Sequence, residues 1–172
     1  EPWATQLQEA SLSSLLAQDR NNNVEGAPEA FLRGGIRDAQ SRYNLRNLIS
    51  AEGKLSAVEL KTLQRLCDAI GLGGTADVLG PALVEAWAPA ATERAPGTGL
   101  APTRIEDLVW LGIDAATITQ LREFADILPQ PTPINLNTAP REVIHAVLDG
   151  VDLGTAARIV RQSGNRFRAL ED

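Results

Sequence analysis

Few residues in this chain could carry out acid–base, nucleophilic or metal chemistry, and their spacing does not assemble a catalytic site. His145 is the only histidine and Cys67 the only cysteine among 172 residues. A catalytic triad needs a histidine beside a nucleophile and an acid, and the sequence around His145 suggests neither partner. The chain has no His-Glu-x-x-His, Cys-x-x-Cys or phosphate-loop glycine pattern. We expect a non-enzymatic protein, with His145 solvated or capping a helix and Cys67 as a small buried thiol.

Adjacent carboxylates occur twice, as Glu106-Asp107 and Glu171-Asp172. Each pair lies at an expected helix start, where carboxylates accept hydrogen bonds from free backbone amides and the helix dipole favours negative charge. Capping therefore explains them without catalysis. The formal net charge of −6 argues against a generic phosphate-binding surface. A local basic patch stays open near the C-terminal end, where arginines gather: Arg158, Arg161, Arg166 and Arg168.

One glycine-centred pattern occurs twice in the C-terminal part of the chain. Residues 112–121 align without a gap with residues 150–159, and both read Gly, β-branched apolar, Asp, two residues, Thr, three residues, then Leu or Ile. Gly112 and Gly150 permit a positive φ at a tight turn. Asp114 and Asp152 can accept from the free amides of the next helix. With the apolar segments that precede them, at 105–111 and 143–148, the pattern predicts two helix–turn–helix units.

The remaining elements follow from hydrophobic spacing. Helical spacing predicts a helix over 3–19, a second over 58–70, capped by Ser56 and stopped at Gly71, and a third over 76–87. The proline- and glycine-rich residues 88–103 predict an exposed loop. Two short extended runs, 31–38 and 42–45, flank the polar turn 39–41 and predict a β-hairpin. No apolar run reaches the ~20 residues that span a bilayer.

The segment Ile-Asn-Leu-Asn-Thr-Ala-Pro at 134–140 lies between the two glycine units, after three alternating prolines. Those prolines enforce an extended backbone and keep a helix from continuing through them. We expect the segment to place a helix start, with Pro140 in the first turn and either Asn137 or Thr138 as the cap. The spacing leaves both caps open. Asn135 belongs to the same motif.

These residues together resemble a helix-hairpin-helix module. The resemblance is carried by Asn-Thr-Ala at 137–139, the short helix, the glycine turn, the second helix, and Arg-Phe-Arg-Ala-Leu-Glu-Asp at 166–172. Two families use this pattern: the DNA-binding hairpin proteins of DNA uptake and repair, and minor pseudopilin K of type II secretion systems. The DNA-binding turn usually reads Gly-apolar-Gly. Asp114 and Asp152 put a carboxylate in place of the second glycine, which repels phosphate.

Two further matches favour the pseudopilin family. Residues 38–48, Asp-Ala-Gln-Ser-Arg-Tyr-Asn-Leu-Arg-Asn-Leu, resemble a strand-and-turn motif of the K family and depart from it at Ser41, Tyr43 and Arg46. The order and spacing from Glu106 to Pro140 also resemble that family. The chain is therefore identified as similar to minor pseudopilin K of type II secretion.

The resemblance implies a helix-rich α+β fold: a pilin-like helix and small antiparallel sheet with a large helical insertion. On this basis we expect a pilin-like helix and hairpin region at 1–50 and a helical insertion at 51–172, with hairpin-like units near 105–128 and 137–172. It also implies a periplasmic domain anchored in the bacterial inner membrane through an N-terminal helix that precedes Glu1.

The function implied by the resemblance is scaffolding. The protein would join the I and J minor pseudopilins at the pseudopilus tip, prime assembly and limit fibre length. Trp3 and Leu7 are the candidate partner contacts. The family is also associated with calcium, but the loop 88–103 contains one carboxylate, Glu93, and no ligand set can be identified. The alternative is a helix-hairpin-helix DNA-binding protein of the DNA-uptake type.

Overall fold

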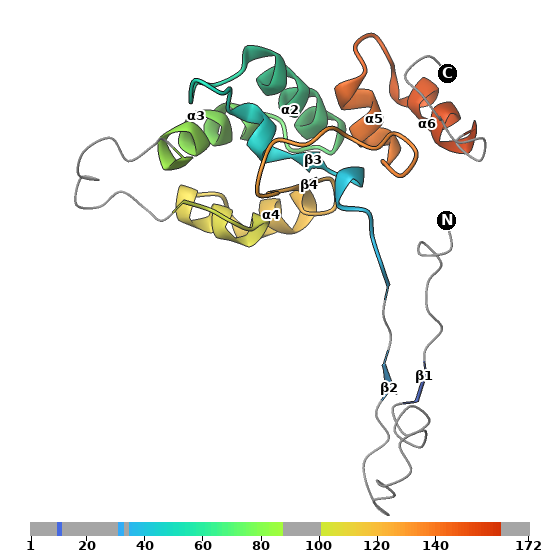
Figure 1. The fold of residues 1–172 in the computed structure, drawn as a ribbon. Helices are drawn as coiled ribbons and strands as arrows, with labels where there is room; N and C mark the ends of the chain where they lie inside the picture. Colours follow the sequence, from blue (N-terminus) through green and yellow to red (C-terminus); the bar gives the residue numbers. More distant parts are fainter. Residues whose placement is uncertain (1–9, 12–30, 33–34, 88–100, 163–172) are drawn as a thin grey trace, which may run out of the picture. The chain divides into compact units, whose positions relative to one another are not determined.

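The computed structural model describes residues 10–11, 31–32, 35–87 and 101–162, and the chain divides into two compact units, Glu1–Asp38 and Ala39–Asp172 (Figure 1). The segment 39–48 contributes Tyr43, Leu45 and Leu48 to the interior of the second unit. The division into a pilin-like region at 1–50 and a helical insertion at 51–172 stays a prediction.

In the first unit, the described residues form one short antiparallel pair. Strand β1 (Ala10–Ser11) pairs with β2 (Phe31–Leu32), with Ala10 opposite Leu32. The helix predicted over 3–19 is therefore wrong at Ala10–Ser11, because these residues pair with a second strand instead of with their own neighbours along the chain. The rest of that predicted helix, including Trp3 and Leu7, lies outside the described residues.

The predicted hairpin around residues 39–41 is also wrong. Ala39–Ser41 form a 3-10 helix, η2, and the strand that follows, β3 (Tyr43–Asn44), pairs in parallel with the distant β4 (Ala125–Asp126). The Tyr43 N–H donates to the Phe124 carbonyl at 2.8 Å. Tyr43 is 1% exposed, so its backbone needs a buried partner. A two-residue strand carries too little pattern to identify that partner.

Helices α2 (Ala57–Ala69) and α3 (Thr75–Trp87) confirm the helices predicted at 58–70 and 76–87. The 3-10 helix η3 (Leu45–Leu48) precedes them. The Ser56 hydroxyl caps α2 by accepting from the Glu59 N–H at 3.4 Å. Past the last turn Gly71 has a φ of 77°, a left-handed conformation that closes the helix end at low steric cost.

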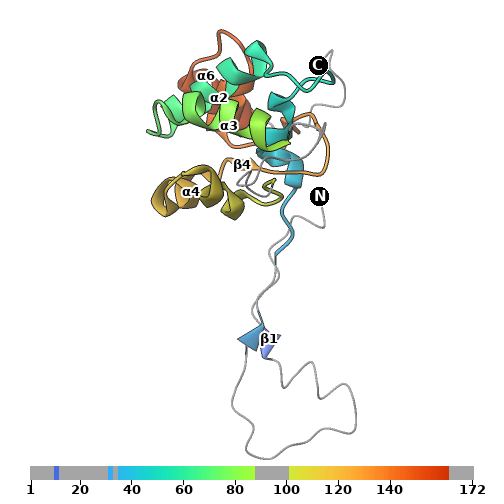
Figure 2. The same cartoon turned by 90° about the vertical axis from the view of Figure 1, so that its left-hand side faces the viewer.

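The second half of this unit consists of η4 (Ile105–Leu111), α4 (Ala115–Leu121), α5 (Arg141–Val147) and α6 (Leu153–Gln162). Figures 1 and 2 show β3 and β4 between α2 and α3 on one side and η4 and α4 on the other. Helix α5 packs against α2, and α6 packs against α5. The fold is helix-rich α+β, as the sequence predicts.

Further sequence predictions fall wholly or partly on residues that the structure does not describe. They are the loop at 88–103, described only from residue 101, the helix start at Glu171-Asp172, and the end of the second hairpin-like unit. Among the described residues, no helix combines the length and apolar character needed to cross a membrane.

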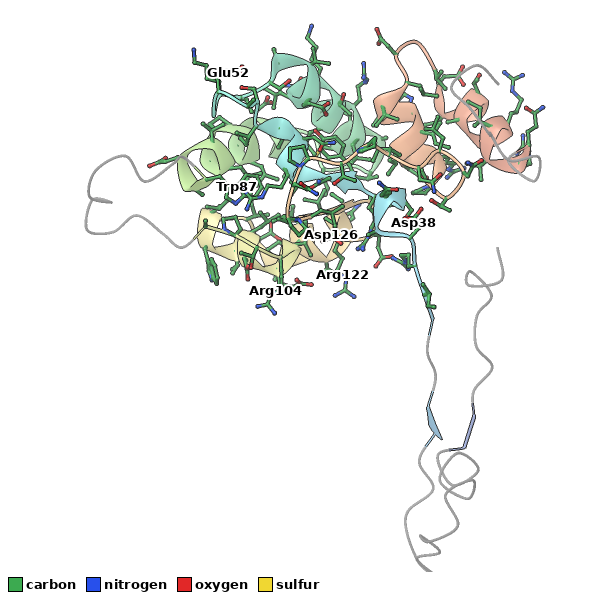
Figure 3. All side chains as sticks on the ribbon, in the orientation of Figure 1. Asp38, Glu52, Trp87, Arg104, Arg122 and Asp126 are labelled. Atoms are coloured by element: carbon green, nitrogen blue, oxygen red, sulfur yellow. The ribbon has the colours of Figure 1, made fainter. Side chains whose placement is uncertain are left out.

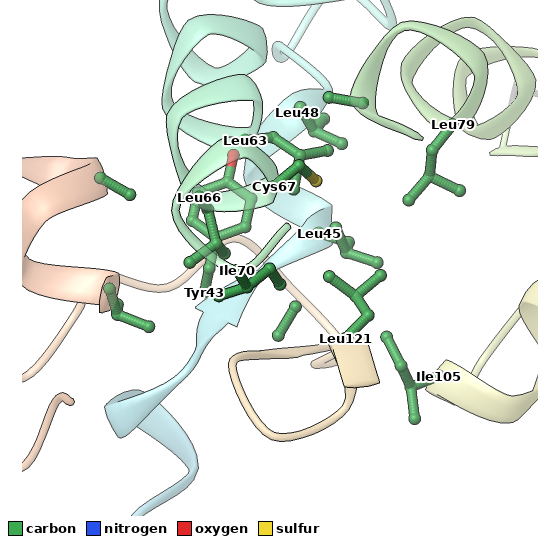
Figure 4. Close-up of a cluster of buried hydrophobic side chains, with 14 of the residues drawn as sticks. Tyr43, Leu45, Leu48, Leu63, Leu66, Cys67, Ile70, Leu79, Ile105 and Leu121 are labelled. Atoms are coloured by element: carbon green, nitrogen blue, oxygen red, sulfur yellow. The ribbon is translucent and has the colours of Figure 1, made fainter. Parts of the chain in front are cut away.

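One apolar core joins these elements, and Figure 4 shows its centre. Leu66 of α2, Leu79 of α3 and Leu121 of α4 are all fully buried. Cys67 lies in the same cluster, and burial raises the pKa of its thiol to about 11. The thiolate is therefore scarce at neutral pH, and the prediction of a small buried thiol is confirmed.

Replacing a core leucine should destabilise this unit measurably. Leu66→Ala removes a fully buried side chain and leaves a cavity, so we expect the free energy of unfolding to fall by roughly 2–5 kcal/mol. Urea denaturation followed by circular dichroism measures the change. The matched control is Val78→Ala on α3, whose side chain is 59% exposed, and its effect should stay within about 0.5 kcal/mol. Equal effects of the two substitutions would contradict the packing described.

Candidate functional site

A polar seam joins the motif at 38–48 to the segment before α5, and it consists of Asn44, Asn47 and the backbone of residues 128–132. The Asn44 amide donates to the Gln130 carbonyl at 2.8 Å, and its oxygen accepts from the Leu128 N–H at 3.1 Å. Asn47 does the same with Thr132, donating to its carbonyl at 3.0 Å and accepting from its N–H at 2.9 Å. Two side-chain amides thus take the place of a neighbouring strand.

The same contact continues at both ends of the polar seam. The Asn135 N–H donates to the Gln40 carbonyl at 2.9 Å. Arg42 forms an ion pair with Asp126 at 2.7 Å and donates to the Arg122 carbonyl at 3.2 Å. Figure 3 labels Asp126 and Arg122. Both side chains of the ion pair are mostly shielded, with 20% and 23% exposed. The pair is therefore less screened by salt than a surface pair.

The segment 134–140 forms a tight turn that places α5. The Asn135 carbonyl accepts from the N–H groups of Thr138 and Ala139 at 3.1 and 3.0 Å. The Asn135 side-chain oxygen accepts from the Asn137 N–H at 3.1 Å. Asn135 therefore organises the turn, whereas sequence reasoning had assigned the polar contact to the residues after it.

The predicted helix cap at Asn137 or Thr138 is wrong. The residue that caps α5 is Pro140, which makes no side-chain hydrogen bond, while its carbonyl accepts from Val143 and Ile144. The reason is steric, since a proline disfavours helical backbone at the residue before it. The helix cannot begin earlier than Pro140, and the two predicted caps lie too far upstream.

The α5–α6 turn is held by a histidine and an aspartate. His145 Nδ1 lies 2.6 Å from the Val151 carbonyl, which only accepts, so this nitrogen carries the proton. Gly150 has a φ of 74°, and the Asp152 carboxylate accepts from the Thr155 N–H at 2.6 Å. Hydrogen bonds from Thr155, backbone first, lower the pKa of Asp152. His145 therefore fixes a turn, which is neither of the roles expected for it.

The η4–α4 turn has the same local geometry. Gly112 has a φ of 82°. Asp114 accepts from the N–H groups of Ala116 and Thr117, both at 3.0 Å, and from the Thr117 hydroxyl at 2.6 Å. These bonds, the Thr117 hydroxyl first, lower the pKa of Asp114. Both turn carboxylates are therefore ionised at neutral pH and are engaged by their own helices.

At the start of η4, the buried Asp107 lies in the first turn and accepts from backbone amides that precede it, those of Thr103 and the N-cap residue Arg104. Its carboxylate accepts from the Thr103 N–H at 2.9 Å and the Arg104 N–H at 3.0 Å, and these bonds lower its pKa. The side chain is only 4% exposed. Such a buried charge is tolerated because its oxygens face several donors.

Helix α2 anchors both glycine units through its backbone and one arginine. Arg65 donates to the Ala146 carbonyl at the end of α5, at 2.9 Å, and to Asp149 at the same distance. Gln120 of α4 donates to the Ile70 carbonyl at the end of α2. In each case a charged or amide group satisfies a carbonyl that a helix end leaves free.

One further contact lies where α3 ends. The Trp87 indole N–H donates to the Pro102 carbonyl at 2.9 Å, and the Arg46 guanidinium lies 4.0 Å from the centre of the Trp87 ring. This cation–π stack connects η3 to α3.

Sequence reasoning missed Asn47, Arg65 and Trp87 as structural contacts. The motif at 38–48 could have pointed to its asparagines, because buried amides need partners. Nothing in the sequence identifies which backbone they meet, and no pattern connects Arg65 to α5.

Within the part of the chain that the structure describes, no group of three or more His, Cys, Asp or Glu side chains comes together in a way that could hold a metal ion. The aspartates of the two turns face backbone amides of their own helices. The polar contacts described above therefore have a structural role, since they fix how the helices of this chain are connected.

Comparison with known proteins agrees with the motifs. Residues 134–172 match the model of the family described as type II secretion system (T2SS), protein K. The match begins at the turn organised by Asn135 and includes α5, the Gly150 turn and α6. The resemblance to the K family is thereby confirmed. No curated protein matches the chain.

Substituting Asn44 should break the polar seam. In Asn44→Asp the group that donates to the Gln130 carbonyl becomes an acceptor, while the side chain stays buried at 1% exposure. We expect the free energy of unfolding to fall by roughly 1–3 kcal/mol. Urea denaturation at pH 7 measures the change. Gln130→Glu is the control, because Gln130 is exposed and contributes its backbone to the seam. If the control is as destabilising, net charge and not the seam is responsible.

The hydroxyl of Thr117 should set the pKa of Asp114. Thr117→Val removes the bond that lowers this pKa most, so the pKa should rise towards the ordinary ~3.9. Because the folded pKa is lowered, the cap stabilises the unit above about pH 3.9, and this contribution is lost as the pH falls through the folded pKa. Carboxyl-carbon NMR titration measures the shift. Asp152, held by Thr155, is the internal reference and should not move, and an unchanged Asp114 would refute the assignment.

Proposed function

We propose that this chain, whose C-terminal part matches type II secretion system protein K, is the water-soluble part of a K-type minor pseudopilin. It would serve as a non-enzymatic assembly component of the type II secretion pseudopilus. One observation carries this proposal: the matched segment and the K-like motif at 38–48 are in direct contact through the Asn135–Gln40 bond. The polar seam holds the residues just before the match, 128–132, against the same motif. Two motifs that resemble one family separately thus form one structural site.

The proposed place of the protein is the tip of the pseudopilus. There it would form a complex with the I and J minor pseudopilins and prime assembly, as the family resemblance implies. The second unit has one continuous core from Tyr43 to Ala156. It would therefore act as a rigid body that crowns the fibre and prevents further subunits from adding above it.

The proposed location is the periplasm, with attachment to the inner membrane through an N-terminal helix that precedes Glu1. Pilin-like partners would then contact the chain near its N-terminal side, and Trp3 and Leu7 remain the candidate contacts. Bound calcium remains a family expectation without identified ligands.

The contacts within the second unit support placing the partner contacts near the N-terminal side of the chain. Asn44, Asn47 and Arg65 are engaged by groups of the same chain. A partner that competed for them would have to open the fold, so we place the binding energy for the I and J partners outside the polar seam and the two turns.

DNA binding, the alternative function, finds no support in the described turns. A hairpin that grips phosphate needs free backbone amides. Here Asp114 accepts from the amides of Ala116 and Thr117, and Asp152 accepts from the amide of Thr155. The lowered pKa of both aspartates keeps them negative at neutral pH.

Mixing this chain with the periplasmic domains of the I and J pseudopilins from the same organism tests the proposal. At micromolar concentration we expect a ternary species in size-exclusion chromatography with light scattering. Leu7→Asp should weaken it, whereas Val58→Asp should not, since Val58 is 72% exposed on α2 and is not one of the proposed contacts. Absence of any ternary species would refute the function. Duplex DNA binding with a steep salt dependence would favour the alternative.

A further inference from the structure

Three arginines in the described part of the chain are partly shielded from solvent: Arg42, Arg46 and Arg65. Two of them are paired with carboxylates. Arg42 forms an ion pair with Asp126 at 2.7 Å, and Arg65 forms one with Asp149 at 2.9 Å. Arg46 forms no ion pair with any residue that the structure describes. Among these three cations, Arg46 is therefore the one whose charge is not matched.

The guanidinium of Arg46 is nevertheless held in place. It lies 4.0 Å from the centre of the Trp87 ring, and the indole N–H of that ring donates to the Pro102 carbonyl at 2.9 Å. The Arg46 backbone N–H donates to the Asn44 side chain at 3.0 Å. The tryptophan covers one face of the planar guanidinium, and the edge with the terminal nitrogens stays available to a planar acceptor.

The charge of Arg46 lacks compensation within the described residues. Its Nε atom is buried without a hydrogen-bond partner. Nε of Arg42 is also unpartnered, but the terminal nitrogens of Arg42 bind Asp126 and the Arg122 carbonyl. Burial lowers the pKa of Arg46, and no neighbouring carboxylate offsets this effect. An arginine stays protonated even so, and a shielded cation without an anion is unfavourable. The missing group is therefore an anion.

A carboxylate suits this position better than a phosphate. Phosphate groups are held best by several cations or by free backbone amides at a helix end, and here one guanidinium is available. The terminal N–H groups of an arginine form a fork that matches the two oxygens of a carboxylate. Because Nε is buried, a carboxylate reaches Arg46 end-on, through Nη1 and Nη2.

The residue types favour a protein as the source of the carboxylate. A single guanidinium offers too little contact to hold a free carboxylate firmly. Inside a larger interface the same ion pair adds specificity and fixes the position of the partner. Arginine and tryptophan are enriched among the residues that dominate the binding energy of interfaces. Arg46 and Trp87 are in contact, and both are partly exposed.

We propose that Arg46, held against Trp87, receives the carboxylate of an aspartate or glutamate side chain of a protein partner. The Arg46 guanidinium takes no part in the polar seam or in the two glycine turns, so a partner can bind it without opening the fold. The proposal goes beyond the proposed function, because it assigns a binding residue and the chemistry of the group that it receives.

NMR on the unmodified full chain tests the site itself. Sodium acetate is titrated against sodium chloride at equal ionic strength, and the Arg46 Nε–H and Trp87 indole signals are followed. We expect both signals to shift saturably with acetate and not with chloride. Arg42 is the matched control, since it is also partly shielded but already paired with Asp126, and its Nε–H signal should not move. Equal responses of the two arginines would overturn the proposal, and so would tighter binding of inorganic phosphate than of acetate.

The I and J pseudopilin domains serve as the protein probe, and this arm of the test rests on the proposed function. Arg46→Gln should weaken the ternary complex at least about tenfold, the order expected when one member of a shielded charge pair is removed. Arg122→Gln is the control, because that side chain is 52% exposed, and it should leave the affinity unchanged.

The outcomes separate the two proposals. If the unmodified chain forms no ternary complex, the proposed function fails, and the acetate titration alone decides about Arg46. If the complex forms and Arg46→Gln binds as tightly, the role of Arg46 is refuted. An acetate affinity that rises in Glu93→Gln would also refute it, because a carboxylate of this chain would then be the occupant. Since the acetate titration uses the unmodified chain, the test holds even if Arg46→Gln fails to fold.

Discussion

The second unit depends on the burial of a short extended segment whose backbone has to find hydrogen-bond partners inside the protein. Tyr43 and Asn44 are each 1% exposed, and β4 supplies partners for them along only two residues. The side-chain amides of Asn44 and Asn47 bind the backbone of residues 128–132, which follow β4, and so hold that segment beside β3 and η3. The Tyr43 hydroxyl donates to the carboxylate of Glu59, in the first turn of α2, at 2.8 Å. Burial, with Glu59 nearby, raises the pKa of Tyr43, so the hydroxyl remains a donor. Strand β3 is thus held through its backbone by β4 and through the Tyr43 side chain by Glu59 of α2.

The features that sequence predicts well here are local. Ser56 marks the start of α2 and Gly71 marks its end, because a cap and a left-handed glycine each act within one helical turn. The glycine turns with their aspartates follow the same logic. The partner of β3 could not be predicted, because a two-residue strand leaves register and neighbour undetermined. The cap of α5 was misplaced because the effect of Pro140 on the preceding residue outweighs the capping preference of Asn137 and Thr138.

The two copies of the glycine pattern have the same turn geometry but are attached to α2 by different contacts. Both copies turn at a glycine with positive φ and begin the next helix at an aspartate. The first is tied to α2 by Gln120 at a helix carbonyl, and the second by Arg65 at the end of α5. Repetition therefore determines the shape of each unit, whereas single polar side chains outside the repeat determine where each one docks.

The Trp87–Pro102 hydrogen bond and the Arg46 stack have a consequence for how the chain tolerates length change. The hydrogen bond joins the end of α3 to the described segment that begins at residue 101, and the stack ties the same Trp87 to η3. Closing a loop whose ends are already fixed becomes only slowly more costly as the loop lengthens, by about 0.6 kcal/mol per doubling. Insertions or deletions between these two residues therefore leave the core almost unaffected, which makes this the place where related chains can diverge in size at little cost to folding.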